Sequence, residues 1–132
     1  MTIGRVKSFI LRSGRMSLAQ ERSYKTADQF LISYSENITD FSLYFCNDKP
    51  LTVEIGFGMG KATAEIATVN PDKNYLGIEV FRAGIGKLLW EIKEHALANI
   101  RIIEHDAVDV VEKMLAPGSV AAFHLFFPDP WP

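Results

Sequence analysis

The chain has 132 residues, of which 48% are hydrophobic and 23% charged, with a formal net charge of −2; this composition excludes a disordered chain. It forms one domain with a buried core, and its single cysteine, Cys46, excludes both an intramolecular disulfide and a metal site built from several cysteines. We find neither a signal-peptide pattern nor an apolar run near the roughly 18 residues of a membrane span. We therefore expect a cytoplasmic protein with no bound metal and no membrane segment.

The small net charge hides an uneven distribution of charge along the chain. Residues 1–25 carry six basic side chains and one acidic one, which gives +5, whereas the other 107 residues carry eight basic and fifteen acidic ones, which gives −7. A polyanion would therefore be attracted to the N-terminal segment. The alternative is a solvated charged surface with no partner.

The N-terminal segment also predicts a short helix. Ser17 with Gln20, and Thr26 with Gln29, have the spacing of a capping box, in which two side chains satisfy free backbone N–H groups at a helix start. We therefore divide the chain into a basic arm with a short helix, residues 1–30, and an α/β domain, residues 31–132.

Four apolar runs of strand length follow in chain order, at residues 51–55, 75–80, 100–103 and 120–127. A glycine-rich turn after residue 55 leads into a helix, and apolar residues repeat with a helical period over 85–92 and 108–115. Nearly continuous apolar strands that alternate with helices are typical of a parallel sheet covered on both faces. We predict a doubly wound α/β fold, in which ligands bind at the carboxyl ends of the strands.

The most informative stretch runs from Glu54 to Gly60 and has the pattern E-x-G-x-G-x-G. It joins a strand, a turn and a helix start, and its glycines allow the backbone to approach a ligand closely. In the G-x-G-x-x-G pattern of dinucleotide-binding folds, the third glycine would fall here on Lys61, so that pattern is absent. A tight turn with no ligand is the alternative interpretation.

Acidic residues follow the next two strands as well. Glu79 ends the second strand, where a carboxylate can accept hydrogen bonds from two ribose hydroxyls, and Asp106 follows the third strand. Because the carboxyl ends of parallel strands meet at one edge of a sheet, we expect Glu54, Glu79 and Asp106 to lie at the same edge. Solvated acids at strand ends are the alternative.

The most distinctive string is F-P-D-P-W at residues 127–131, where prolines fix the backbone around a carboxylate and an aromatic side chain can stack on a base. The E-x-G-x-G-x-G loop resembles the cofactor loop of class I S-adenosylmethionine-dependent methyltransferases. Together with that loop, G-I-E-V at 77–80 and the basic motif at 7–15 with Gln20, the F-P-D-P-W string resembles the bacterial tRNA (guanine-N(7))-methyltransferase family. Lys7 stands where we would expect an arginine.

The resemblance implies a Rossmann-like class I methyltransferase fold, S-adenosylmethionine as the cofactor and tRNA as the partner. It implies that Arg12 and Arg15 contact tRNA phosphates. N(7) of guanine carries a lone pair and no proton, so its methylation requires orientation and nearby negative charge but no strong base, and Asp129 is the implied catalytic carboxylate. The implied cofactor-binding residues are Glu54, Gly56, Gly58, Gly60, Glu79, Asp106, Ala107 and Asp129.

Family members continue past F-P-D-P-W into a basic segment and further strands. The resemblance therefore implies the N-terminal portion of a longer domain, with a sheet that is incomplete on its C-terminal side and a fourth strand left as an exposed apolar edge. We expect a monomer or a homodimer. Two alternatives stay open: a catalytically silent module that holds cofactor or RNA, and a class I methyltransferase acting on another nucleophile, because P-D-P loosely resembles the loops of amino-methylating enzymes.

The remaining candidates carry weaker signals. His95 and His124 have no partners at metal-ligand spacing, so we expect them to be ordinary packing or surface residues. Four large apolar side chains are expected in the core: Trp90, Phe123, Leu125 and Phe127.

Overall fold

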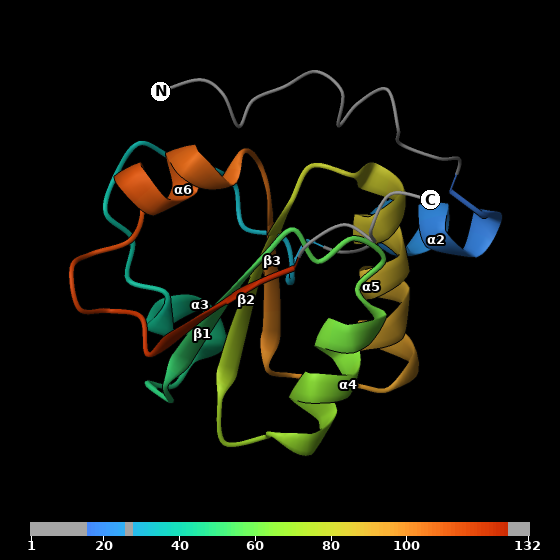
Figure 1. Cartoon of the computed structure of the whole chain (residues 1–132). Coiled ribbons are helices and arrows are strands. Elements are labelled where there is room, and N and C mark those ends of the chain that lie inside the picture. The colour runs from blue at the N-terminus through green and yellow to red at the C-terminus, as the bar shows by residue number, and fades with distance from the viewer. Residues whose placement is uncertain (1–15, 26–27, 127–132) are drawn as a thin grey trace.

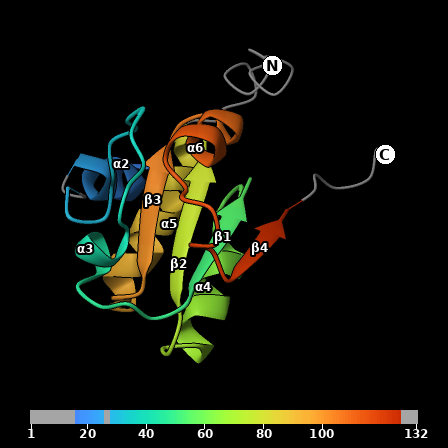
Figure 2. The ribbon, with the colours of Figure 1, turned by 90° about the vertical axis from the view of Figure 1, so that its left-hand side faces the viewer.

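The computed structural model describes residues 16–25 and 28–126. At its centre lies a sheet of four parallel strands, seen nearly edge-on in Figure 1, and their order is β3-β2-β1-β4 (Figure 2). The strands are β1 (Leu51–Ile55), β2 (Asn74–Glu79), β3 (Ile100–Glu104) and β4 (Ala122–Leu125). The helices are α2 (Leu18–Lys25), α3 (Ser42–Phe45), α4 (Lys61–Val69), α5 (Arg82–Glu94) and α6 (Ala107–Lys113). Within these residues, no helix is long and apolar enough to cross a membrane.

The parallel sheet with helices between its strands confirms the predicted α/β fold class. β1 has the predicted bounds, and the bounds of β2 and β3 differ from the predicted ones by at most one residue at each end. β4 is shorter than the predicted 120–127, and residue 127 lies outside the described residues. The sequence does not predict α3, because four residues are too few to show a helical repeat.

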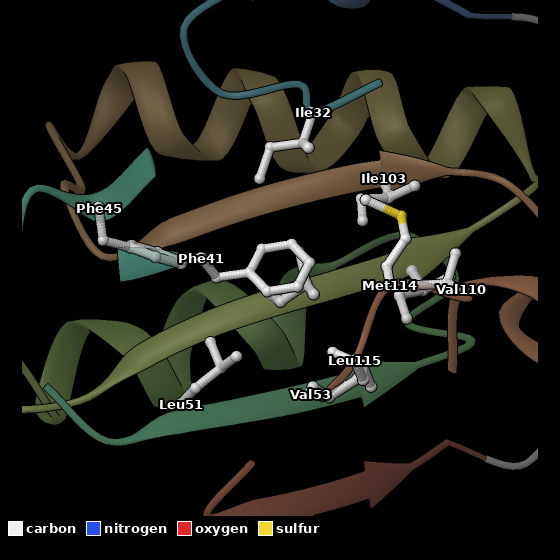
Figure 3. Close-up of a cluster of buried hydrophobic side chains, with 11 residues drawn as sticks. Ile32, Phe41, Phe45, Leu51, Val53, Ile103, Val110, Met114 and Leu115 are labelled. Atoms are coloured by element: carbon white, nitrogen blue, oxygen red, sulfur yellow. The ribbon is translucent and has the colours of Figure 1, made fainter. Parts of the chain in front are cut away.

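Alternate side chains of β2 point into two hydrophobic cores, one on each face of the sheet. Tyr75 packs with residues of α4 and α5, whereas Leu76 and Ile78 pack with residues of α3 and α6. We call these sides the α4/α5 face and the α3/α6 face. Figure 1 shows the two pairs of helices on opposite sides of the sheet, and in Figure 2 α4 and α5 lie behind the strands. Figure 3 shows the core on the α3/α6 face, which includes Ile32, Phe41, Phe45, Leu51, Val53, Ile103, Val110, Met114 and Leu115.

α2 begins with the capping box that the sequence predicts. The backbone N–H of Gln20 donates to the hydroxyl oxygen of Ser17 over 3.2 Å, and the N–H of Ser17 donates to Oε1 of Gln20 over 3.0 Å. The second predicted box starts at Thr26, which lies outside the described residues. α2 packs closely on α5: a Cβ atom at Gly86 would lie 3.2 Å from Cβ of Gln20 in α2, and 2.7 Å from Sδ of Met16, which precedes the helix.

The two outer strands of the sheet differ in how their edges are covered. The segment around Leu31 forms a bridge to β3: the N–H of Ile102 donates to the carbonyl of Phe30, and the N–H of Ile32 donates to the carbonyl of Ile102, each over 2.8 Å. β4, in contrast, pairs with β1 and with no other strand in the described part of the chain. It is the exposed edge that the sequence predicts.

The expected core positions of the last strand are wrong for the described residues. Phe123 is 49% exposed and Leu125 is 56% exposed, because nothing within residues 16–25 and 28–126 covers their side of β4. Trp90 is partly exposed and not in the core; its ring lies 4.2 Å from Nζ of Lys87, close enough for a cation–π contact. Phe127 lies outside the described residues.

Gly84, in the first turn of α5, allows this helix to touch the glycine-rich turn. A Cβ atom at Gly84 would lie 1.6 Å from the carbonyl oxygen of Gly58, a backbone atom that cannot move without displacing the turn. We expect Gly84→Ala to lower the free energy of unfolding in urea by about 1–3 kcal/mol, the usual cost of overpacking. Gly86→Ala is the matched control, since there the only atom closer than 3.0 Å to the new methyl group would be Sδ of Met16, near the flexible end of a side chain, and the atoms of Gln20 lie at 3.2 Å or more. Equal losses in the two variants would contradict this account.

Candidate functional site

Three glycines in left-handed conformations form the turn between β1 and α4. Gly56, Gly58 and Gly60 have φ angles of 72°, 61° and 76°, values that other residues rarely adopt. Gly60 is also held by packing, because a Cβ atom there would lie 2.6 Å from Cβ of Leu88. A Cβ atom at Gly58 would meet nothing within 4 Å. The middle of the turn is therefore bare backbone next to open space, which a ligand can approach.

Glu79 ties this turn to the end of β2 and the start of α5. Its Oε1 accepts the backbone N–H of Gly58 over 2.7 Å, and its Oε2 accepts the N–H groups of Val80 and Phe81 over 3.0 and 3.1 Å. The residue is 8% exposed. Hydrogen bonds to a carboxylate are stronger than those between neutral groups, and each oxygen can accept more than one. Glu79 can therefore hold the turn and still accept a hydroxyl from a ligand.

Glu54 lies one residue before the end of β1 and is completely buried. Its Oε2 lies 3.0 Å from Nδ1 of His124, whereas its Oε1 has no hydrogen-bond partner among the described residues. In the register of β1 with β4, Glu54 stands directly opposite His124. The sequence predicts His124 to be an ordinary packing or surface residue and gives no signal for this pair, because its partner is 70 positions away in the chain.

Asp106 begins α6 at the carboxyl end of β3. Its Oδ1 accepts the N–H of Val108 over 2.8 Å, so it is the N-cap of the helix, and Ala107 is the first helical residue. Asp106, Glu79 and Glu54 thus follow or end three adjacent strands at their carboxyl ends, as the sequence predicts. Their roles toward a ligand stay predictions.

A polar cluster that the sequence did not predict joins α2 to this edge of the sheet. The hydroxyl of Tyr24 donates to Oε1 of Glu104, the last residue of β3, and Nε of Arg82 lies 3.4 Å from the other oxygen of that carboxylate. The guanidinium of Arg82 also lies 4.5 Å from the ring centre of Tyr24. Burial raises the pKa of Glu104 above its usual value. The helix of the basic arm is therefore anchored two residues before Asp106.

Three of the predicted site residues fall outside the described residues: Asp129, Arg12 and Arg15. The last described residue is Phe126, whose N–H donates to the carbonyl of Ile55 over 3.0 Å and whose own carbonyl oxygen lies beside Gly56. The described part of the chain therefore ends next to the glycine turn.

A cavity of about 660 Å³ lies elsewhere, between α2, the C-terminal half of α5 and the start of β3. It is lined by Ser23, Gln29, Phe30, Leu89, Ile92, Lys93, Ala96, Leu97, Ala98 and Arg101. It contains none of the predicted site residues and lies at the amino end of β3. Since ligands of doubly wound sheets bind at the carboxyl ends of the strands, we place the candidate site at the glycine turn and not in this cavity.

Comparison with known proteins gives consistent matches. Residues 48–132 match the model of a family described as "Putative methyltransferase". A tRNA (guanine-N(7)-)-methyltransferase of Treponema pallidum (strain Nichols) is 44% identical over 97% of this chain and 62% of the relative. Proteins with the same description from Polaromonas sp. (strain JS666 / ATCC BAA-500) and Burkholderia vietnamiensis are 46% and 48% identical over 96% of this chain, which corresponds to 52% and 50% of their lengths. The chain thus spans between 50% and 62% of the length of these curated relatives.

The contacts of Glu79 predict a large effect on stability. Glu79→Ala leaves the N–H groups of Gly58, Val80 and Phe81 without their acceptor, and hydrogen bonds to charged groups contribute about 1.5–3 kcal/mol each. We expect the free energy of unfolding in urea to fall by at least about 2 kcal/mol. The control is Glu65→Ala, an exposed carboxylate on α4, which should change it by less than about 0.5 kcal/mol. If both variants are equally stable, Glu79 does not hold the turn.

Proposed function

The chain belongs to the methyltransferase family whose model matches residues 48–132, and on that premise we propose that it binds S-adenosylmethionine at the glycine turn and methylates N(7) of a guanosine in tRNA. The observation that carries this proposal is the bare backbone at Gly58, held open by the carboxylate of Glu79. The relatives at 44–48% identity, described as tRNA (guanine-N(7)-)-methyltransferases, support the choice of nucleophile.

The residues at the carboxyl edge fit the functional groups of this cofactor. The unpartnered, buried Oε1 of Glu54 can accept a hydrogen bond from the ammonium group of the amino-acid portion. Glu79 can accept hydrogen bonds from the ribose hydroxyls, and Asp106 with Ala107 lies at the strand end where the adenine would bind. The glycine turn would lie along the amino-acid portion, where side chains would obstruct it.

Methylation of N(7) of guanine requires little acid–base catalysis from the protein. When bound, S-adenosylmethionine supplies an electrophilic methyl group on a sulfonium sulfur. N(7) of guanine forms the new bond to that methyl group while the carbon–sulfur bond breaks, so the positive charge moves from sulfur to the purine. The protein must align the two partners and place negative charge near the purine, and Asp129 is the residue we propose for that charge.

The basic arm is the part that we propose to bind tRNA. Residues 1–25 have a net charge of +5, and Arg12 and Arg15 would contact phosphates. The contact of Tyr24 with Glu104 supports this assignment, because it holds the end of α2 at the edge of the sheet that carries Asp106. The arm continues into this helix, so we propose that it brings RNA to the cofactor site. Two further expectations stay predictions: that the protein is a monomer or a homodimer, and that it is cytoplasmic.

A catalytically silent cofactor- or RNA-binding module is the second candidate. It is favoured by the coverage of the relatives, since this chain spans 50–62% of their length, and by the exposed apolar side of β4 at Phe123 and Leu125. A class I methyltransferase acting on another nucleophile is the third interpretation. The three functions differ in whether a methyl group is transferred and to which atom.

Two tRNA transcripts separate these functions. One contains guanosine and the other 7-deazaguanosine, in which a C–H group replaces N(7) while the base-pairing edge is unchanged. We expect the full chain to transfer labelled methyl groups from S-adenosylmethionine to the first transcript and none to the second. Equal labelling of both would show that another atom is the nucleophile. No labelling of either, by a chain that binds S-adenosylhomocysteine, would identify a silent module.

A further inference from the structure

We propose that His124 is a positioning residue for the cofactor: it fixes the carboxylate of Glu54 so that the free Oε1 binds the ammonium group of the amino-acid portion. This inference rests on the proposed function. It goes beyond that function because it assigns a role to a histidine of β4 that contacts the ligand only through Glu54.

The register of the sheet brings the two residues together. β1 and β4 pair in parallel with Glu54 opposite His124. Val53 and Ile55, the neighbours of Glu54 in β1, pack on the α3/α6 face, so the side chains of Glu54 and His124 stand on the α4/α5 face. Nδ1 of His124 lies 3.0 Å from Oε2 of Glu54. With Glu54 ionised, its oxygen can only accept, and Nδ1 then carries the hydrogen of this bond. The imidazole therefore ties one oxygen and sets the rotation of the carboxyl group.

The second carboxylate oxygen of Glu54, Oε1, is the atom that we propose to bind the ligand. Oε1 of Glu54 is buried and has no partner among the described residues, and the whole side chain is 0% exposed. Leaving a buried acceptor unsatisfied is costly, so such atoms in proteins call for an explanation such as a ligand. The ligand group must donate a hydrogen bond and is favoured if it is positive. An ammonium group meets both conditions, whereas a sulfonium has no N–H or O–H to donate.

The two side chains differ in their contact with water. The side chain of His124 is 43% exposed, so it has contact with water at the open edge of β4, whereas Glu54 has none. Burial raises the pKa of the Tyr75 hydroxyl, which is on the adjacent strand, and the nearby carboxylate of Glu54 raises it further. Without His124, that charge would lose the one hydrogen bond it has among the described residues.

Two ligands and two variants test this inference by calorimetric titration of the full chain. S-adenosylhomocysteine carries the amino-acid portion, whereas 5′-methylthioadenosine retains the adenine, ribose and sulfur but lacks that portion, with both its ammonium and its carboxylate group. We expect His124→Ala to weaken binding of S-adenosylhomocysteine by about tenfold or more and binding of 5′-methylthioadenosine by less than about twofold. His124→Asn, whose side-chain amide nitrogen stands where Nδ1 of the imidazole is, should recover most of the affinity.

The other outcomes overturn the inference in distinguishable ways. Equal weakening of both ligands in His124→Ala would mean that His124 only stabilises β4. Unchanged binding of both ligands would mean that it does not orient Glu54. If the wild-type chain binds neither ligand while its unfolding transition shows that it is folded, the proposed function fails together with this inference.

Discussion

The structure depends on one constraint: the chain must turn sharply between β1 and α4 in a backbone conformation that non-glycine residues avoid. Gly56, Gly58 and Gly60 meet this constraint by taking positive φ angles, and the carboxylate of Glu79 holds the middle of the turn through the N–H of Gly58. The same carboxylate accepts the N–H groups at the start of α5, so β2, the turn and α5 meet at one side chain. Gly84 completes the arrangement by allowing α5 to approach the turn.

Two residues at this turn do not contribute to the stability of the fold in the usual way. Glu54 is buried with one oxygen unsatisfied among the described residues. Gly58 has open space where a side chain would be, and a glycine costs more conformational entropy on folding than other residues do. Features that break local rules in this way concentrate at functional sites, where a ligand supplies the missing contacts. A ligand that binds only the folded chain would also stabilise it. The cofactor assignment explains both features with one bound molecule.

The sequence predicts the parts of the fold that depend on local periodicity. Continuous apolar runs give the first three strands within a residue at each end, and the S-x-x-Q spacing gives the start of α2. Alternating glycines and strand-end acids give the position of the candidate site. Contacts between distant segments are not encoded in this way: the pair of Glu54 with His124, the contact of Tyr24 with Glu104 and the bridge of Leu31 to β3 depend on the packed structure. Exposure of Phe123 likewise depends on what covers β4, which its apolar character does not reveal.

We propose that the carboxyl edge of the sheet around the glycine turn binds the cofactor. A titration monitored by NMR of the backbone amide groups tests this most directly. S-adenosylhomocysteine is added to the isotopically labelled chain, and the shifts of individual backbone N–H groups are measured. We expect saturable shifts in the residues of the turn and of the adjoining strand ends: Gly56, Gly58, Gly60, Val80, Phe81 and Asp106. We expect no shifts at Leu89, Ala96 and Leu97, which line the cavity at the other end of the sheet. Shifts confined to that cavity, or no shifts at all, would contradict it.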